Sequence, residues 1–275
     1  LYTMYFTGVY SDTDMANIKY YNRAENKGDK IFYLMNGSQQ KLGGGGGGTD
    51  TAMRILNGGS PNNDYDYPAN GPIFPVKHDS KEANTDELKG KGVEIIVNTT
   101  GDKSGCNKVN FKITKNFNLQ TGSVILVNIN DEQLNKVSIT GYSAKDGNKP
   151  QIRGVFHLLA PYGTNEKECF QLIYNYYQEI FNKMIEIANK DENKDKTVVL
   201  HLIDTPGQLF HGTVLTCKLA LYALFNIVKD STKVLEHSNL QINIGFLQNH
   251  REEIDTLLKE YTPDNEYKLE TLIAP

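Results

Sequence analysis

Short apolar runs alternate with longer amphipathic stretches along this chain of 275 residues. The runs are rich in Val, Ile, Leu and aromatic residues, as strands are, and the longer stretches repeat apolar residues at helical spacing. The pattern predicts strands at residues 2–10, 31–35, 122–129, 153–160, 197–203 and 240–247. It predicts helices that begin near residue 49 and after residue 212, and others at 168–189 and 252–261.

Strands that alternate with helices favour an α/β fold with a mixed, mostly parallel sheet covered by helices on both faces. We expect one domain over residues 1–275, interrupted by an insertion at about 58–116. Two possible strands inside it, at 93–98 and 109–114, predict a hairpin rather than a second core. In such a sheet, ligands bind beyond the carboxyl ends of the strands.

Six consecutive glycines at 43–48 join the apolar run at 31–35 to the helix that begins near Thr49. A strand, a glycine-rich loop and a helix start together place backbone N–H groups and a positive helix end at one point, which suits a phosphate or diphosphate. The alternative is a flexible linker or a tag remnant. The strand pattern before the run and the cap-like Thr49-Asp50 pair after it favour the loop. No G-K-[ST] follows, which disfavours a P-loop.

A second strand-to-helix junction lies at residues 204–212, which follow the apolar run at 197–203. This junction also carries glycine and precedes a helix with an apolar face. Because both junctions follow strands of the same expected sheet, we predict that the two loops lie together beyond its carboxyl edge.

Charge and cysteine content exclude several classes of site. The 29 basic and 33 acidic residues, with six histidines, leave no basic surface for duplex nucleic acid. The three cysteines lie far apart without metal-ligand or disulfide spacing, so we expect no metal site and a reducing cytosol, either the cell's own or that of a host. The most apolar long stretch, 214–228, contains Lys218 and is too short to span a membrane, so no membrane partner is expected.

Four segments in order make the chain similar to the macrodomain, a module that binds ADP-ribose. Asn36-Gly-Ser-Gln-Gln-Lys-Leu followed by Gly45-Gly-Gly-Gly-Thr49-Asp50 resembles the family's N-A-A-N and G-G-G-V-D-G. GVFHLLAPYG at 154–163 resembles V-I-H-x-V-G-P, and TPGQLF at 205–210 resembles S-T-G-I-F. The resemblance covers residues 1–58 and 117–261, and it implies a three-layer α/β/α fold.

The resemblance also implies roles for single residues. An early acid, matched by Asp12 or Asp14, holds the adenine, and the aromatic matched by Phe210 packs against the distal ribose. The backbone near the distal ribose and the phosphates is supplied by positions that match Gly45, Gly46, Gly47, Gly48, Thr205, Gly207, Gln208 and Leu209. No cofactor is implied.

The branch that the glycine loop most resembles, the mono-ADP-ribosyl hydrolases, implies an enzyme that removes ADP-ribose from protein side chains. Asp50 would orient or activate a water molecule, and Asn36 would hold the ribose. The alternative role for Asp50 is a helix cap, and Asp204 is a reserve candidate for the acid. Gln39 or Gln40 replaces the second Asn of the family motif, which favours a second hypothesis, a non-catalytic reader of ADP-ribose. A third is an interaction module that has lost its ligand and contacts a partner through the insertion.

Three histidines lie near the expected strands. His157 and His201 fall inside apolar runs with no metal-ligand spacing, and we interpret both as core or strand-end residues. His211 borders the second loop.

Overall fold

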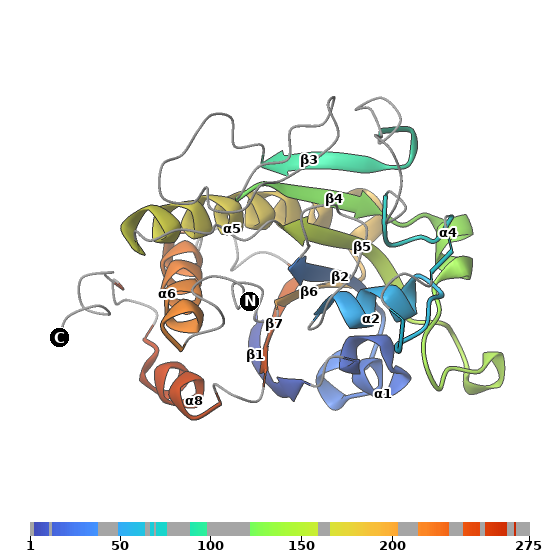
Figure 1. Ribbon diagram of the computed structural model, residues 1–275, viewed down its shortest axis with the longest axis horizontal. Helices are drawn as coiled ribbons and strands as arrows, with labels where there is room; N and C mark the ends of the chain where they lie inside the picture. Colours follow the sequence, from blue (N-terminus) through green and yellow to red (C-terminus); the bar gives the residue numbers. More distant parts are fainter. Residues whose placement is uncertain are drawn as a thin grey trace.

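The computed structural model describes residues 3–10, 13–37, 49–63, 67–68, 70–75, 89–97, 122–158, 166–202, 214–230, 239–247, 251–262 and 267. Seven strands of this part of the chain form one sheet in the order β1-β7-β6-β2-β5-β4-β3 (Figure 1). Their bounds are β1 Thr3–Tyr10, β2 Lys30–Gly37, β3 Val93–Val97, β4 Val124–Asn128, β5 Gln151–Leu158, β6 Thr197–Leu202 and β7 Leu240–Leu247.

The sheet is mixed and mostly parallel, as the sequence predicts. Neighbouring strands pair in parallel through β1, β7, β6, β2 and β5. The pairings of β5 with β4 and of β4 with β3, at one side of the sheet, are antiparallel. β2 occupies the middle position, between β6 and β5. A strand in that position is covered on both faces, which explains why all residues of β2 after Lys30 are buried.

Helices cover both faces of the sheet. Ile31, Tyr33 and Met35 of β2 pack into the core beneath α5 (Glu166–Ala188) and α6 (Val214–Asp230). Phe32 and Leu34 point to the other face and pack into the core beneath α1 (Ile18–Tyr21) and α2 (Thr49–Leu56). This alternation follows from the two-residue period of a strand. The result is a three-layer α/β/α arrangement.

Short helices complete the described chain. They are α4 (Asp131–Lys136), α8 (Arg251–Glu260) and the 3-10 turns η1 (Asp14–Ala16), η2 (Ala24–Asn26), η3 (Ala144–Asp146) and η4 (Asp191–Asn193). The apolar pattern predicts α8 but neither α4 nor η3. None of the described helices combines the length and apolar composition that a bilayer crossing requires.

Part of the expected insertion belongs to the main fold. Val93–Val97, expected to form a hairpin within the insertion, pairs antiparallel with β4 as a strand of the central sheet. The other expected strand, 109–114, lies outside the described residues. Tyr67, Ile73 and Phe74 are buried in the same core as α2. These segments therefore complete the core of the domain.

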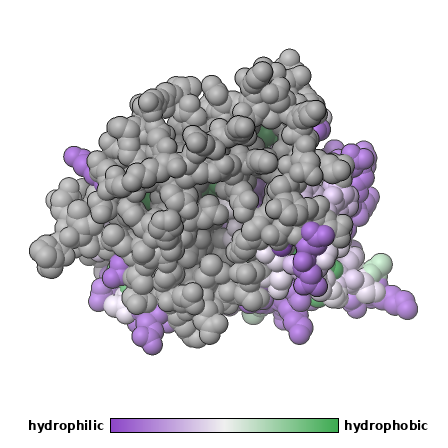
Figure 2. All heavy atoms as spheres, viewed as in Figure 1, coloured by the Kyte–Doolittle hydropathy of each residue, from purple (hydrophilic) through white to green (hydrophobic). Residues whose placement is uncertain are grey.

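The described surface is mainly hydrophilic in the view of Figure 2. Within the described part of the chain, Ile95 on β3 is the large hydrophobic residue that stands out as exposed, at 41%.

Candidate functional site

The end of β2 and the start of α2 bring two predicted site residues together. Asn36 is the last residue but one of β2, and Asp50 lies in the first turn of α2. The Asn36 side-chain amide donates a hydrogen bond of 2.7 Å to Oδ1 of Asp50. Both side chains are buried, with 0% and 1% exposure. A carboxylate at the amino end of a helix is stabilised by the helix dipole, so this end of α2 suits a negatively charged Asp50.

Thr49 fixes the same junction through its hydroxyl group. Thr49 Oγ1 donates to Oδ1 of Asn36 at 2.7 Å and accepts a hydrogen bond from the backbone N–H of Gly37 at 3.1 Å. The first residue of α2 is therefore tied to the last two residues of β2. The pair Asn36 and Asp50 is held from both elements.

His157 on the neighbouring strand completes the network. Asn36 and His157 are register partners in the parallel pairing of β2 with β5, so both side chains point to the α2 face. The second hydrogen of the Asn36 amide is directed at Nδ1 of His157, at 3.1 Å. Nε2 of His157 lies 2.9 Å from the carbonyl oxygen of Ile73. Because a carbonyl only accepts, Nε2 carries the proton and Nδ1 accepts from Asn36.

The imidazole of His157 is neutral in this environment. Burial lowers the pKa of His157 to about 4, and the hydrogen bond to the Ile73 carbonyl opposes that shift in part. A neutral ring is required for Nδ1 to accept from Asn36. His157 is fully buried, which confirms its interpretation as a core residue, and its hydrogen bonds assign it a defined partner on each side.

The hydrogen bonds of Asn36 determine which role its side chain can take. Both N–H donors of its amide are used inside the protein, by Asp50 and His157, and its oxygen accepts from Thr49. In this arrangement Asn36 orients Asp50. Its donors would reach a ribose only if one of the two bonds were exchanged. The carboxylate, with two oxygens and several acceptor sites, is the group of this network able to accept a proton from a water molecule.

Asp14 is the described candidate for the adenine contact. It begins η1, whose residues Met15 and Ala16 pack in the same core as α2. η1 contacts α2 directly. Asp14 therefore lies on the same side of the sheet as Asn36 and Asp50, partly exposed. The remaining expected ligand contacts lie outside the described residues, namely Asp12, Gly45, Gly46, Gly47, Gly48, Thr205, Gly207, Gln208, Leu209 and Phe210.

The second predicted junction leaves the sheet at the same edge. β6 runs parallel to β2 and pairs with it directly, with Leu34 opposite His201. The carboxyl ends of β2 and β6, at Gly37 and Leu202, therefore lie side by side. The next described helices along the chain are α2, from Thr49, and α6, from Val214. The reserve candidate Asp204 and His211 lie between the described ends of β6 and α6.

His201 is also a core residue, as expected. It is fully buried on β6, and its Nδ1 is hydrogen-bonded to the hydroxyl of Tyr20 on α1. Burial, together with the nearby Arg23 guanidinium, lowers the pKa of His201 to about 3. On the α2 face of the sheet, His157 thus connects β5 to the segment that carries Ile73, and His201 connects β6 to α1. Among the residues that the structure describes, no group of three or more His, Cys, Asp or Glu is arranged to hold a metal ion.

The sequence pattern does not predict the contacts of His157 with Asn36 and with the Ile73 carbonyl. The period-two pattern of the apolar run at 153–160 places His157 on one face of a strand, but only the register with β2 sets it opposite Asn36. The chain matches no protein-family model, and no curated protein is significantly similar to it.

Proposed function

We propose that this protein binds ADP-ribose and hydrolyses it from modified protein side chains. The observation that supports the proposal is the hydrogen bond of 2.7 Å between Asn36 and Asp50, at the point where β2 ends and α2 begins. Those two residues are the catalytic pair implied by the resemblance to mono-ADP-ribosyl hydrolases of the macrodomain type. The mixed sheet between two helical layers is the architecture expected for that family.

The reaction requires a positioned water molecule and stabilisation of the positive charge that develops on the ribose. Cleavage at C1″ of the distal ribose proceeds through an oxocarbenium-like state. In our proposal the Asp50 carboxylate orients the water, accepts its proton as the new C1″–O bond forms, and stabilises the developing positive charge. The protein side chain leaves with the electrons of the broken bond and takes up a proton. Asn36, held by His157 and Thr49, keeps Asp50 in place.

The glycine run and the second loop would hold the diphosphate. We assign this role to Gly45 to Gly48 and to Thr205, Gly207, Gln208 and Leu209 from the resemblance alone, with Phe210 against the distal ribose and Asp12 or Asp14 at the adenine. Backbone N–H groups are suitable donors for phosphate oxygens. The spacing of the three cysteines leads us to propose a reducing cytosol as the working compartment.

Calorimetry and a release assay test the proposal together. ADP-ribose is titrated beside AMP and NAD, and release of free ADP-ribose is measured on proteins modified through carboxylate or arginine side chains. We expect ADP-ribose to bind and at least one substrate to be cleaved. Asp50→Ala should abolish turnover and leave binding within about tenfold. The matched control is Asp131→Ala, which removes the first-turn acid of α4 instead. Retained turnover in Asp50→Ala would exclude Asp50 as the carboxylate that activates the water.

A non-catalytic reader is the second candidate, and one observation favours it. Asp50 is 1% exposed and accepts from Asn36, so its Oδ1 already has a structural partner. A reader would bind ADP-ribose with saturation and release no product from either substrate. Loss of binding in Gly47→Glu, with no turnover in the parent protein, would identify this outcome. Absence of ADP-ribose binding in the parent protein would contradict both candidates.

A further inference from the structure

A pocket opens at the edge of the sheet opposite to the Asn36 and Asp50 pair. It has a volume of about 760 Å³. The strands β6, β2 and β5 are adjacent and parallel, so their amino ends meet at one edge. The pocket is lined by the residues around those amino ends and by the segment from Asn26 to Phe32. We call it the amino-edge pocket.

Lysines from separate segments gather in the amino-edge pocket. Lys196 directly precedes β6, Lys30 is the first residue of β2, and Lys149 lies two residues before β5. Lys27 adds a fourth, and Asp29 is the acidic residue in the lining. This excess of positive charge occurs in a chain whose formal net charge is −4. A concave site lined by one sign of charge concentrates ligands of the opposite sign.

Two of the lysines are held in place by the protein. Nζ of Lys30 donates to Oε1 of Gln241 at 2.7 Å and to the carbonyl oxygen of Glu25. Nζ of Lys149 donates to the carbonyl oxygen of Asn135 at 3.2 Å. Burial lowers the pKa of both ammonium groups, and the nearby Glu25 opposes the shift for Lys30. An anion beside them would offset the cost of that burial.

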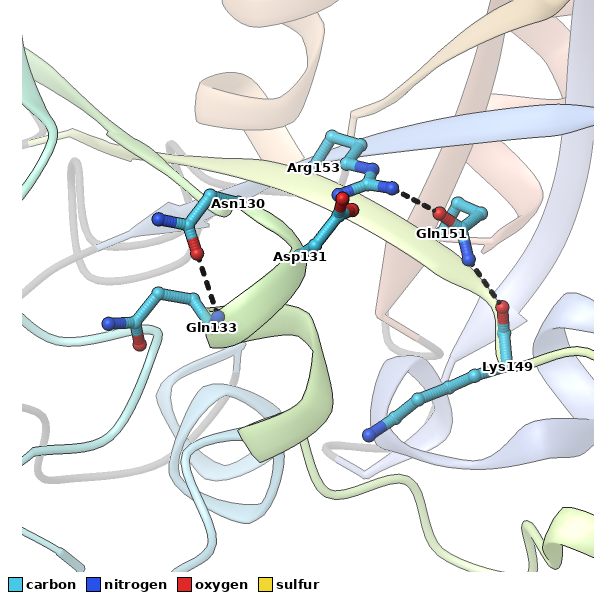
Figure 3. A network of polar contacts seen from close by, with 6 residues as sticks. All are labelled: Asn130, Asp131, Gln133, Lys149, Gln151 and Arg153. Atoms are coloured by element: carbon cyan, nitrogen blue, oxygen red, sulfur yellow. Dashed lines mark hydrogen bonds and ion pairs between the residues drawn. The ribbon is translucent and has the colours of Figure 1, made fainter.

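The β5 side of the pocket is ordered by a chain of hydrogen bonds. Figure 3 shows Gln151 between Arg153 and the backbone of Lys149. Gln151 Nε2 donates to the Lys149 carbonyl at 3.0 Å, and Arg153 donates to Oε1 of Gln151 at 2.5 Å. Arg153 also pairs with Asp131 at 2.8 Å. The amide of Gln151 is thus held in the pocket wall between the backbone of Lys149, which also lines the pocket, and Arg153, which does not.

We propose that the amino-edge pocket binds a small metabolite that carries two or more phosphate groups. Its volume of about 760 Å³ lies within the usual range for small-molecule sites. Four lysines against one aspartate favour a ligand of multiple negative charge, and ammonium groups from separate segments can reach several phosphate oxygens. A long nucleic acid would need a basic surface that continues beyond the pocket, which the net charge of −4 does not favour. The proposal is independent of the function at Asn36 and Asp50.

Inorganic pyrophosphate is the probe that tests this site. Binding is followed by calorimetry and by amide chemical shifts in ¹⁵N-labelled protein, with the ionic strength held constant. We expect one saturable site, with the largest shifts at the amides of Gly28, Asp29 and Lys30. The double variant Lys27→Gln, Lys196→Gln spares the two lysines that make internal hydrogen bonds. It should weaken binding roughly tenfold or more. The double variant Lys145→Gln, Lys259→Gln, on η3 and α8 and outside the pocket lining, is the charge-matched control.

The outcomes separate this site from the proposed ADP-ribose site. Pyrophosphate binding that survives in Gly47→Glu and is weakened in the lysine double variant supports the amino-edge pocket. Binding lost in Gly47→Glu and unchanged in the double variant would overturn it and place the anion at the glycine run. The absence of any saturable binding of pyrophosphate would also overturn it.

Discussion

Asn36 donates a hydrogen bond of 2.7 Å to Asp50 across the junction between β2 and α2, and the same amide is directed at Nδ1 of His157. An amide has two N–H donors, and here each has a buried acceptor. The position therefore requires a side chain that donates in two directions. That requirement leads to a prediction for the closest isosteric change.

Asn36→Asp should destabilise the fold in a pH-dependent way. The change replaces the donor to Asp50 with an acceptor, so two buried carboxyl groups share one site. We expect a loss of about 2 to 5 kcal/mol in the free energy of unfolding at pH 7.5. The loss should be smaller at pH 5, because repulsion between two buried carboxylates favours the uptake of a proton by one of them. Urea unfolding of the parent and the variant at both pH values measures this difference.

The control for that experiment is Asn62→Asp, because Asn62 is exposed. It introduces the same charge and should change the free energy of unfolding by about 0.5 kcal/mol or less. Equal destabilisation by Asn36→Asp at the two pH values would contradict the paired-carboxyl explanation.

His157 should make the protein less stable as the pH falls below 6.5. The folded pKa, about 4, lies below the unfolded value of about 6.5, so only the unfolded state binds a proton between them. Stability from this group is therefore complete above the unfolded pKa and decreases as the pH falls toward the folded one. We expect His157 to account for about 2 kcal/mol of the stability lost between pH 7 and pH 5.

The measurement is the slope of unfolding free energy against pH for the parent and for His157→Gln. Gln does not titrate and can still form a hydrogen bond at one of the two ring positions. The variant should be less stable at pH 7 and should show a shallower slope between pH 7 and pH 5. His201, whose pKa is lowered to about 3, will keep part of the slope in both proteins. An unchanged slope in His157→Gln would show that folding does not lower the pKa of His157.

The sequence predicts most elements because their apolar residues are regularly spaced. β2, β6, α2 and α5 are long or strongly patterned, and each lies where the pattern predicts it. The pattern does not predict α4, because this helix has six residues and only Leu134 among them is buried. The other sequence feature that indicates this helix is its cap, Asn130, whose side chain accepts a hydrogen bond from the backbone N–H of Gln133. An Asn of this kind is also common in turns, so it does not predict a helix by itself.

Long-range pairing could not be predicted from the same pattern. The apolar run at residues 93–98 indicates a strand, but nothing local selects β4 as its partner over a nearby segment. For the site, the resemblance to the macrodomain implies that Asn36 and Asp50 flank the same ribose, and the structure joins the two side chains by a hydrogen bond. The parallel register of β2 and β5 sets His157 opposite Asn36, and the contact between His157 and Ile73 joins residues 84 positions apart that no local pattern brings together.

Gly154→Ala should destabilise the sheet by overpacking its centre. A Cβ at this position of β5 would lie 2.7 Å from ring carbons of Tyr33 and 2.9 Å from a methyl carbon of Leu126. Both neighbours are buried in the core beneath α5 and α6, so neither can move freely. We expect a loss of about 1 to 3 kcal/mol in the free energy of unfolding. Gly90→Ala is the matched control, because a Cβ there meets no atom within 4 Å. Equal stability of the two variants would contradict the close packing at Gly154.

Asn57 connects α2 to the segment that carries Ile73, and its loss should affect both stability and the site. Oδ1 of Asn57 accepts from the backbone N–H of Ile73 at 2.8 Å and of Phe74 at 3.2 Å. Asn57→Ala leaves these two buried donors without that acceptor. We expect a loss of about 2 to 4 kcal/mol in the free energy of unfolding.

The effect on the site follows from the carbonyl of Ile73, which holds His157 at 2.9 Å. If the segment moves, His157 loses its acceptor and Asn36 loses a fixed partner. In Asn57→Ala, the ring ¹⁵N shifts of His157 should therefore indicate a mixture of tautomers, whereas the parent should show the Nε2–H form alone. Asn62→Ala, at an exposed position, should leave both stability and the His157 signal unchanged. A pure Nε2–H signal in a destabilised Asn57→Ala would show that Asn57 supports the fold without controlling His157.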